Sequence, residues 1–390
     1  MTPRPTLGRV LRSFLADPSA VAGLRLSPHQ RKTLRALAVC RTGGLGAQAY
    51  FCPHCRREHV VAHSCRNRHC PQCQGALAVE WLEKQSQALL PVPYFHLVFT
   101  LPHCLNGLIR QNRAALFKLL FDAATQTLLE FGAERLEAQL GITAVLHTWS
   151  QTLGDHYHLH CIVTGGGVAH DQSRWVATSP HYLFPVRALS RRSRGKYLAG
   201  LSSLHATGKL EFHGQLQVLA EPEQFAALLR KAAQPEWVVY AKRPFAGPEQ
   251  VLAYLSRYTH RVAISPRRLL AAEATTVTFA YRDYADGSRQ KMMTLTTAEF
   301  VRRFCLHVLP KGFVKTRHYG LLSNRNREER LARARELLGA AAVSEPKPLP
   351  ELLQTPTTEP TPGICPFCQR PGLLRLGRVM PRPVAVLDSS

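Results

Sequence analysis

The sequence contains no run of about 18 apolar residues and no strongly amphipathic Lys/Arg helix with an exposed aromatic face. These absences argue against a protein that spans or lies on a membrane. Residues 1–20 begin with basic side chains, but Arg12 and Asp17 interrupt the apolar stretch, so the segment does not read as a secretory signal. We therefore expect a cytoplasmic protein with no membrane partner.

Acidic residues are scarce. Asp and Glu number 26 against 50 Lys and Arg, which gives a formal net charge of +24 and a pI near 10.1. A field of this sign favours a polyanionic partner, and with membranes argued against, nucleic acid is the expected one. The sequence also lacks the GxxxxGK[ST] loop of a nucleotide-driven motor, and it shows no internal repeat of 20 to 50 residues.

The chain of 390 residues is long enough for two or three compact units. Composition divides it into a helix plus a Cys-rich segment over 1–90, alternating strand-like and helix-like segments over 91–335, and a tail over 336–390. The tail opens with a Pro/Thr-rich stretch that is typical of a linker. Within the middle unit we expect strands at 94–101, 142–151 and 155–164, helices near 113–140, 186–206, 221–233 and 249–260, and a hairpin over 277–296.

Eleven cysteines in a reducing compartment indicate metal binding or buried thiols rather than disulfides. Cys52-Pro-His-Cys55 and Cys70-Pro-Gln-Cys73 form two CxxC pairs separated by 14 residues. This spacing lets two turns present four thiolates to one Zn²⁺, which would stabilise a segment too small to fold on its own core. The alternative is a chance pairing of buried cysteines.

Further cysteines leave the number of zinc ions open. Cys40 and Cys65 lie in the same stretch and are candidates for an exchanged ligand or a second ion. Cys365 and Cys368 near the end of the chain offer half a site, which needs partners from elsewhere or is simply a reduced turn.

Three histidines alternate in the strand-like segment that begins at Asp155. His156, His158 and His160 would project to one side of a strand, with Leu159 packed into the core. Two or three imidazoles completed by an oxygen ligand make a site for a divalent ion that polarises a phosphate oxygen.

Two tyrosines are spaced four apart in the expected helix over 249–260. Tyr254 and Tyr258 would lie on one helix face, about one turn apart. When a tyrosine attacks a phosphodiester, the energy of the broken bond is kept in a covalent phosphotyrosine. Paired aromatic residues at this spacing, however, more often pack in a protein core. The neighbouring Arg257, His260 and Arg261 are cations suited to holding phosphate groups. The strand with the histidines would supply the metal site that a tyrosine nickase needs.

These motifs together resemble a known family. HYHLHCIV with its trailing glycines, YLSRYTHRVAIS and the preceding SCRNRHCPQCQ look like the HUH-type transposases of the insertion-sequence ninety-one family, over roughly residues 30–325. The resemblance implies an α+β fold, in which a small zinc-binding domain precedes an HUH-type central antiparallel sheet flanked by helices. It also implies that His158 and His160 hold Mg²⁺ or Mn²⁺. Tyr254 and Tyr258 would then be the nucleophiles.

The third ligand of the catalytic ion does not carry over from the family, so Gln151 at the end of the preceding strand and His156 both stay open. The substrates implied are single-stranded DNA at element ends and target DNA, and unwinding would fall to host replication or helicase factors. The expected phosphate and DNA contacts are made by basic residues: Arg66, Arg68, Arg257, His260, Arg261, Lys315 and Arg317.

The implied function is a transposase that nicks and rejoins DNA through phosphotyrosine intermediates. A replication initiator or relaxase with the same chemistry is the first alternative. The second alternative is a non-catalytic zinc protein that binds DNA, in which the tyrosines and histidines only contribute to core packing.

Overall fold

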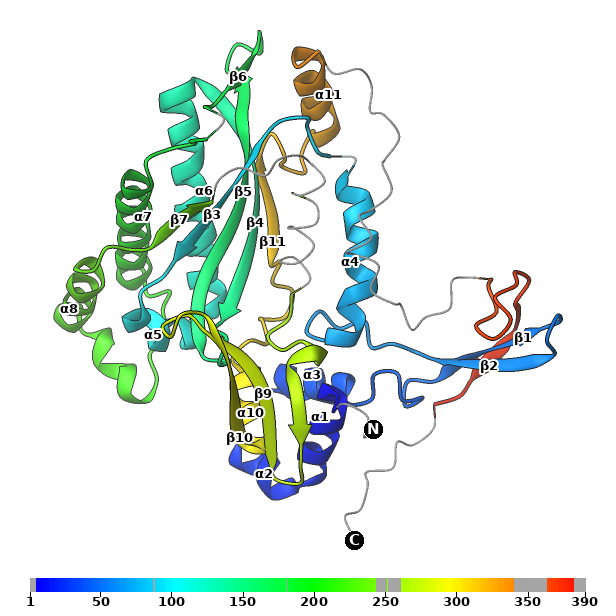
Figure 1. Ribbon diagram of the computed structural model, residues 1–390. Helices are drawn as coiled ribbons and strands as arrows, with labels where there is room; N and C mark the ends of the chain where they lie inside the picture. Colours follow the sequence, from blue (N-terminus) through cyan, green and yellow to red (C-terminus); the bar gives the residue numbers. More distant parts are fainter. Residues whose placement is uncertain are drawn as a thin grey trace.

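The computed structural model describes residues 5–86, 88–179, 181–242, 251, 261–339 and 363–381. It has an α+β architecture, with a central antiparallel sheet flanked by helices and a cysteine-rich segment before it (Figure 1). The expected fold class is confirmed. The expected tyrosine helix lies, apart from Val251, outside the described residues, as does the linker over 340–362.

The central sheet has the strand order β11-β4-β5-β3-β7, and β6 pairs with β5 beyond this path. Every pairing in it is antiparallel. The strands are β3 Tyr94–Thr100, β4 Ala138–Trp149, β5 Asp155–Ala169, β6 Trp175–Ala177, β7 Val239–Lys242 and β11 Thr316–Gly320. The long strands β4 and β5 lie side by side in the middle, where side chains are shielded on both faces.

One face of this sheet is covered by α6 and α7, as Figure 1 shows. Alternate residues of β5, among them Tyr157, Leu159 and Cys161, are fully buried against this helical layer. The helices that build and extend the layer are α5 Asn106–Gln111, α6 Arg113–Leu136, α7 Val186–Ala206 and α8 Pro222–Ala233. Because side chains alternate along a strand, the histidines of β5 lie on the opposite face.

That opposite face carries a smaller apolar cluster. Tyr94 of β3 and Ile162 of β5 pack there against Leu331 of α11, with Val251 fully buried among them. The helices on this side are α4 Pro71–Ser86 and α11 Arg327–Leu337. We call this surface the histidine face, because His96 and His160 lie on the same strands two residues from Tyr94 and Ile162.

A second apolar core joins the beginning of the chain to residues 263–308. Here α1 Leu7–Ala16 packs against α3 Pro28–Ala38 and α10 Thr297–Cys305, beside the sheet β8-β9-β10. Its strands are β8 Leu269–Ala272, β9 Thr276–Asp283 and β10 Arg289–Thr296, and the short α2 covers Pro18–Gly23. The expected hairpin is confirmed. The division of the chain at residues 90 and 335 stays a prediction, and the contacts of this core cross the first of these boundaries.

Local sequence explains where these helices start. Ser27 accepts a hydrogen bond from the Gln30 backbone N–H while the Gln30 side chain accepts from the Ser27 N–H, and Pro28 occupies the first turn of α3. Thr296 caps α10 by accepting from the Glu299 N–H.

The strand that carries the histidines continues past its expected end at residue 164. β5 continues through Gly165–Gly167 to Ala169, and its pairing with β4 shifts register between Leu140 and Ile142. A Cβ on Gly167 would lie 2.3 Å from the carbonyl oxygen of Gln139. The glycines therefore permit a close approach of two backbones within the sheet instead of a turn.

The third sheet brings the two ends of the described chain together. Its order is β12-β1-β2, formed by β1 Ala47–Cys52, β2 Arg57–Ala62 and β12 Leu374–Val379. In Figure 1 the last described segment lies along the β1–β2 hairpin, at some distance from the central sheet. Among the described residues, no helix is both long enough and apolar enough to cross a bilayer.

Candidate metal centre and active site

Three imidazoles converge on the histidine face. His147 of β4 and His158 and His160 of β5 place one nitrogen each within 4.8 Å of the others. The ring centroids of His147 and His160 are 4.5 Å apart, and those of His158 and His160 are 4.9 Å apart. The expected pair, His158 and His160, is thus joined by a histidine that the sequence reasoning did not single out.

The register between β4 and β5 puts His147 there. From Ile142 to His147 the two strands pair without interruption, which sets His147 opposite His158. Directly paired residues of an antiparallel ladder lie on the same face of the sheet. The one irregularity nearby follows His147, between it and Trp149, toward the turn that joins the strands.

Burial keeps these imidazoles neutral. The pKa of His158 is lowered to about 3, chiefly by desolvation and then by the nearby charges of His156 and Arg261. The pKa of His160 is lowered even further, by desolvation first and then by His147 and His158. A neutral imidazole offers the lone pair that a metal ion requires.

Hydrogen bonds orient both predicted ligands. Nδ1 of His158 donates to the His156 carbonyl oxygen at 2.9 Å, and Nδ1 of His160 is 2.8 Å from Nε2 of His96. With each Nδ1 engaged, Nε2 is the nitrogen that we expect to coordinate an ion. Such outer contacts fix the tautomer and direction of metal-binding histidines.

The two residues left open as third ligands lie elsewhere. The Gln151 side chain donates to the Tyr284 hydroxyl at 3.4 Å, in the turn that follows β4. The His156 ring lies 4.7 Å from that of His158, but it is not in the group whose nitrogens lie within 4.8 Å of one another. His147 occupies the place foreseen for them.

Tyr254, Tyr258, Arg257 and His260 lie outside the described residues. The described residues on either side of them are informative. Val251 is buried in the apolar cluster of the histidine face, and Arg261 is close enough for its charge to lower the pKa of both His158 and His160. Val251 and Arg261, the described residues that flank the tyrosines, therefore both lie near the face where the imidazoles converge.

A basic patch adjoins the imidazoles. Nζ of Lys315 donates to the Arg261 carbonyl oxygen at 3.0 Å and lies 5.8 Å from the Trp149 ring, which itself stacks on His147 at 4.7 Å. Desolvation lowers the pKa of Lys315 to about 7. Arg261 is exposed.

Three other arginines of the expected DNA surface differ in their surroundings. Arg66 is exposed, but Arg68 donates to the carbonyl oxygens of Pro310 and Phe313 and so ties the cysteine-rich segment to the chain before β11. The Arg317 guanidinium lies 4.3 Å from the Phe121 ring. Arg68 and Arg317 therefore have structural contacts in addition to any role with DNA.

The cysteines form two groups instead of the single site expected from the CxxC pairs. Cys70 and Cys73, at the start of α4, meet Cys40 and Cys65. The remaining pair lies with the cysteines near the end of the described chain, in a group formed by Cys52, Cys55, Cys365 and Cys368.

The β1–β2 hairpin explains the division. Cys52 and Cys55 lie at its tip, whereas Cys40 and Cys65 flank its base. Strands of six residues place these points about 20 Å apart. In the first group the Sγ atoms of Cys40 and Cys73 are 3.6 Å apart, and those of Cys65 and Cys73 are 3.7 Å apart. A Zn²⁺ ion with four thiolates at about 2.3 Å requires sulfur atoms about 3.8 Å apart, so this donor set fits the ion.

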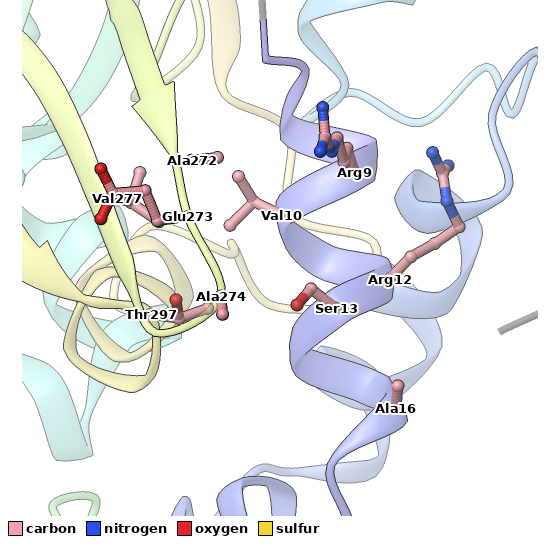
Figure 2. Close-up of a pocket in the computed structure, with 10 residues that line it drawn as sticks. All are labelled: Arg9, Val10, Arg12, Ser13, Ala16, Ala272, Glu273, Ala274, Val277 and Thr297. Carbon is pink, nitrogen blue, oxygen red and sulfur yellow. The ribbon is translucent and has the colours of Figure 1, made fainter. Parts of the chain in front are cut away.

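A separate cavity of about 410 Å³ lies between α1 and the β8–β9 connection, as Figure 2 shows. Its lining includes Arg9 and Arg12 on one side and Glu273 on the other. None of the residues predicted from the sequence lines it, so it does not compete with the histidine face as the candidate active site.

Comparison with known proteins agrees with this geometry. Residues 141–330 match the family model described as "Putative transposase", and residues 10–101 match the one described as "Transposase zinc-binding domain". A Sinorhizobium fredii protein, y4qJ, which carries the first of these descriptions in its name, is 46% identical over 333 residues, or 85% of this chain and 82% of the relative. The transposase for insertion sequence element IS801 of Pseudomonas savastanoi pv. phaseolicola is 30% identical over 344 residues, or 86% of this chain and 80% of the relative.

The chain belongs to the IS91 family of transposases. Family membership makes DNA the substrate of this transposase and DNA cleavage its class of reaction. The zinc-binding family model and the cysteine groups together support a structural zinc ion in the N-terminal part of the transposase.

Proposed function

We propose that this transposase nicks and rejoins single-stranded DNA through phosphotyrosine intermediates, in rolling-circle-like transposition. The observation that carries the proposal is the cluster of His147, His158 and His160, which lies near Val251 and Arg261, the described residues that flank the tyrosines. Tyr254 and Tyr258 are the proposed nucleophiles.

The histidine cluster fits a divalent ion held by three imidazoles. Mg²⁺ demands oxygen ligands, whereas Mn²⁺ and later transition metals accept nitrogen, so we propose Mn²⁺ ahead of Mg²⁺. Such an ion would polarise the scissile phosphate and offset the charge that develops on its oxygens.

The protein's own groups carry the remaining chemistry. The oxygen of one tyrosine forms a bond to phosphorus as the bond to the 3′ oxygen breaks, so the DNA keeps a free 3′-hydroxyl and the protein a 5′-phosphotyrosine. The phenolic proton leaves the nucleophile and the departing 3′ oxygen gains one. Reversal of this step by a different 3′-hydroxyl joins strands, and a second tyrosine serves the next strand.

Basic residues position the substrate. We propose that Arg261 and Lys315 hold phosphates beside the imidazoles, with Arg257 and His260 of the tyrosine-containing segment, while Arg66 touches the backbone from the cysteine-rich segment. Trp149 beside His147 offers an aromatic face for a base. With DNA at element ends and target DNA as substrates, the transposase would act in the cytoplasm, and host replication or helicase factors would unwind the duplex.

A nicking assay on single-stranded element ends with Mn²⁺ tests the proposal. We expect wild-type cleavage and no cleavage by the variant His158→Ala/His160→Ala. The matched control is His170→Ala, which removes an exposed histidine beyond the same strand. Equal activity of the double variant and the wild type would leave a zinc DNA-binding protein whose histidines only pack.

The covalent intermediate gives an independent test. A protein–DNA adduct trapped with a suicide oligonucleotide should map by mass spectrometry to Tyr254 or Tyr258 and disappear in the doubly substituted phenylalanine variant. Tyr182→Phe, at an exposed tyrosine, should keep the adduct. An adduct on any other residue contradicts the assignment. The transposase relatives favour transposition over plasmid replication as the setting for this chemistry.

A further inference from the structure

The second cysteine group joins the N-terminal part of the chain to its C-terminal part. The Sγ atoms of Cys52 and Cys368 are 3.6 Å apart, as are those of Cys55 and Cys365, although the latter pair is 310 residues apart in sequence. We infer that Cys52, Cys55, Cys365 and Cys368 bind a second structural zinc ion, which fastens the C-terminal segment 363–381 to the β1–β2 hairpin. This inference does not depend on the proposed nickase chemistry.

The distances between the sulfur atoms fit zinc coordination and are too long for a disulfide bond. Four thiolates about 2.3 Å from Zn²⁺ stand about 3.8 Å from one another. A disulfide would require about 2.05 Å. The matched zinc-binding family model ends at residue 101, so it assigns no role to Cys365 or Cys368.

The two CxxC pairs adopt the same local structure. Cys55 is followed by Arg56 at φ 54°, and Cys368 is followed by Gln369 at φ 58°, both in the left-handed region. In the second turn the Gln369 N–H donates to the Cys365 carbonyl oxygen at 2.9 Å, which closes the loop around the sulfur atoms. Two matching turns that face each other are the arrangement by which paired CxxC sequences surround a zinc ion.

Apolar packing alone does not account for the position of the C-terminal segment. Leu374, Leu376 and Met380 are 54%, 56% and 78% exposed, and Cys365 is the buried apolar side chain of segment 363–381. The backbone pairs with β1, and Arg375 donates to the Gln48 side chain at 2.8 Å. Each hydrogen bond contributes little net stability, so closing so long a loop requires a further source of binding energy.

A metal ion supplies that energy. Zinc binding by four thiolates stabilises folded segments that have almost no core of their own. The ion would therefore act as the clamp of the β12-β1-β2 sheet, separate from the ion expected at Cys40, Cys65, Cys70 and Cys73.

Zinc content of the purified full-length protein tests the inference. The His158→Ala/His160→Ala protein serves as the parent, so that the histidine cluster adds no zinc ion to the count. After dialysis, mass spectrometry of the metal should give two zinc ions per chain for this parent and one when Cys365→Ser/Cys368→Ser is added. Cys104→Ser removes a half-buried thiol that belongs to neither group, so it should keep two in the same parent. One ion in the parent, or two after the double cysteine substitution, would overturn the inference.

Hydrogen exchange covers the case in which the double variant fails to fold. In wild-type protein treated with a graded amount of chelator, amides of β12 and β1 should lose protection together as the first equivalent of zinc leaves, and regain it when zinc is restored. Amides of β4 and β5 should stay protected throughout, since their packing involves no cysteine of this group. Unchanged exchange in β12 after loss of both zinc ions would show that no metal holds the segment.

Discussion

Replacing His147 by alanine separates the structural account of the metal centre from the one that the sequence suggested. The substitution removes one of three imidazoles whose nitrogens lie within 4.8 Å of one another. Loss of an outer contact to a metal ligand typically weakens metal binding by about 10- to 100-fold. Loss of a ligand itself should reach or exceed the upper value, which corresponds to about 2.7 kcal/mol.

Gln151→Ala is the matched comparison, because Gln151 was the alternative oxygen donor. Its side chain contacts the Tyr284 hydroxyl in an open turn, so we expect its removal to change Mn²⁺ affinity by less than about threefold. His156→Ala should fall between the two, since His158 hydrogen bonds to the His156 backbone carbonyl, which the substitution retains.

Calorimetric titration of Mn²⁺ into full-length protein with its zinc sites filled measures these affinities directly, and circular dichroism checks that each variant is folded. The same three variants should rank in the same order in the nicking assay. The reasoning is refuted if His147→Ala binds Mn²⁺ as tightly as the wild type, or if Gln151→Ala is the variant that loses the ion.

Three further outcomes follow from the described contacts. His96→Ala should weaken Mn²⁺ binding by about 10- to 100-fold without removing a ligand, because the 2.8 Å contact that orients His160 is lost; unchanged affinity would mean that the orientation of His160 does not depend on it. Burial lowers the pKa of His307 to about 4, so the unfolded chain takes up its proton first as the pH falls below about 6.5. The free energy of unfolding should therefore drop by about 2 kcal/mol between about pH 7 and about pH 5 through this group, and denaturant titrations should show a smaller drop for His307→Gln. Gly167→Ala should destabilise the protein by about 1–3 kcal/mol, since the new Cβ would meet the Gln139 carbonyl. Gly195→Ala in α7, where a new Cβ would have nothing within 4 Å, should stabilise the protein by about 0.5–1 kcal/mol. Thermal melts that rank the two variants the other way contradict this account.

The histidine strand shows how far sequence periodicity reaches. The alternation of His158 and His160 with Leu159 and Cys161 predicted which side chains share a face, and the structure places them so. His147 could not be found in the same way, because its position opposite His158 depends on the register between two strands. Periodicity is a property of one strand, whereas register belongs to the pair.

The cysteines show a second kind of limit. The CxxC spacing marked Cys52, Cys55, Cys70 and Cys73 as candidate zinc ligands, and each lies in a cysteine group that could hold an ion. Proximity in sequence, however, suggested that the four meet one another. A hairpin between the pairs keeps them apart, and the partners of the first pair come from the other end of the chain. Local spacing identifies the donor turns, and only the topology decides which turns share an ion.

The choice of ligands in the histidine cluster determines the charge of the metal site. The grouped residues are imidazoles, burial lowers the pKa of His158 and His160, and among the described residues no carboxylate belongs to the group. Neutral ligands leave the full charge of a bound divalent ion uncompensated, whereas two carboxylates would cancel it. With Arg261 beside the cluster, the site would then be positive and selective for a phosphodiester.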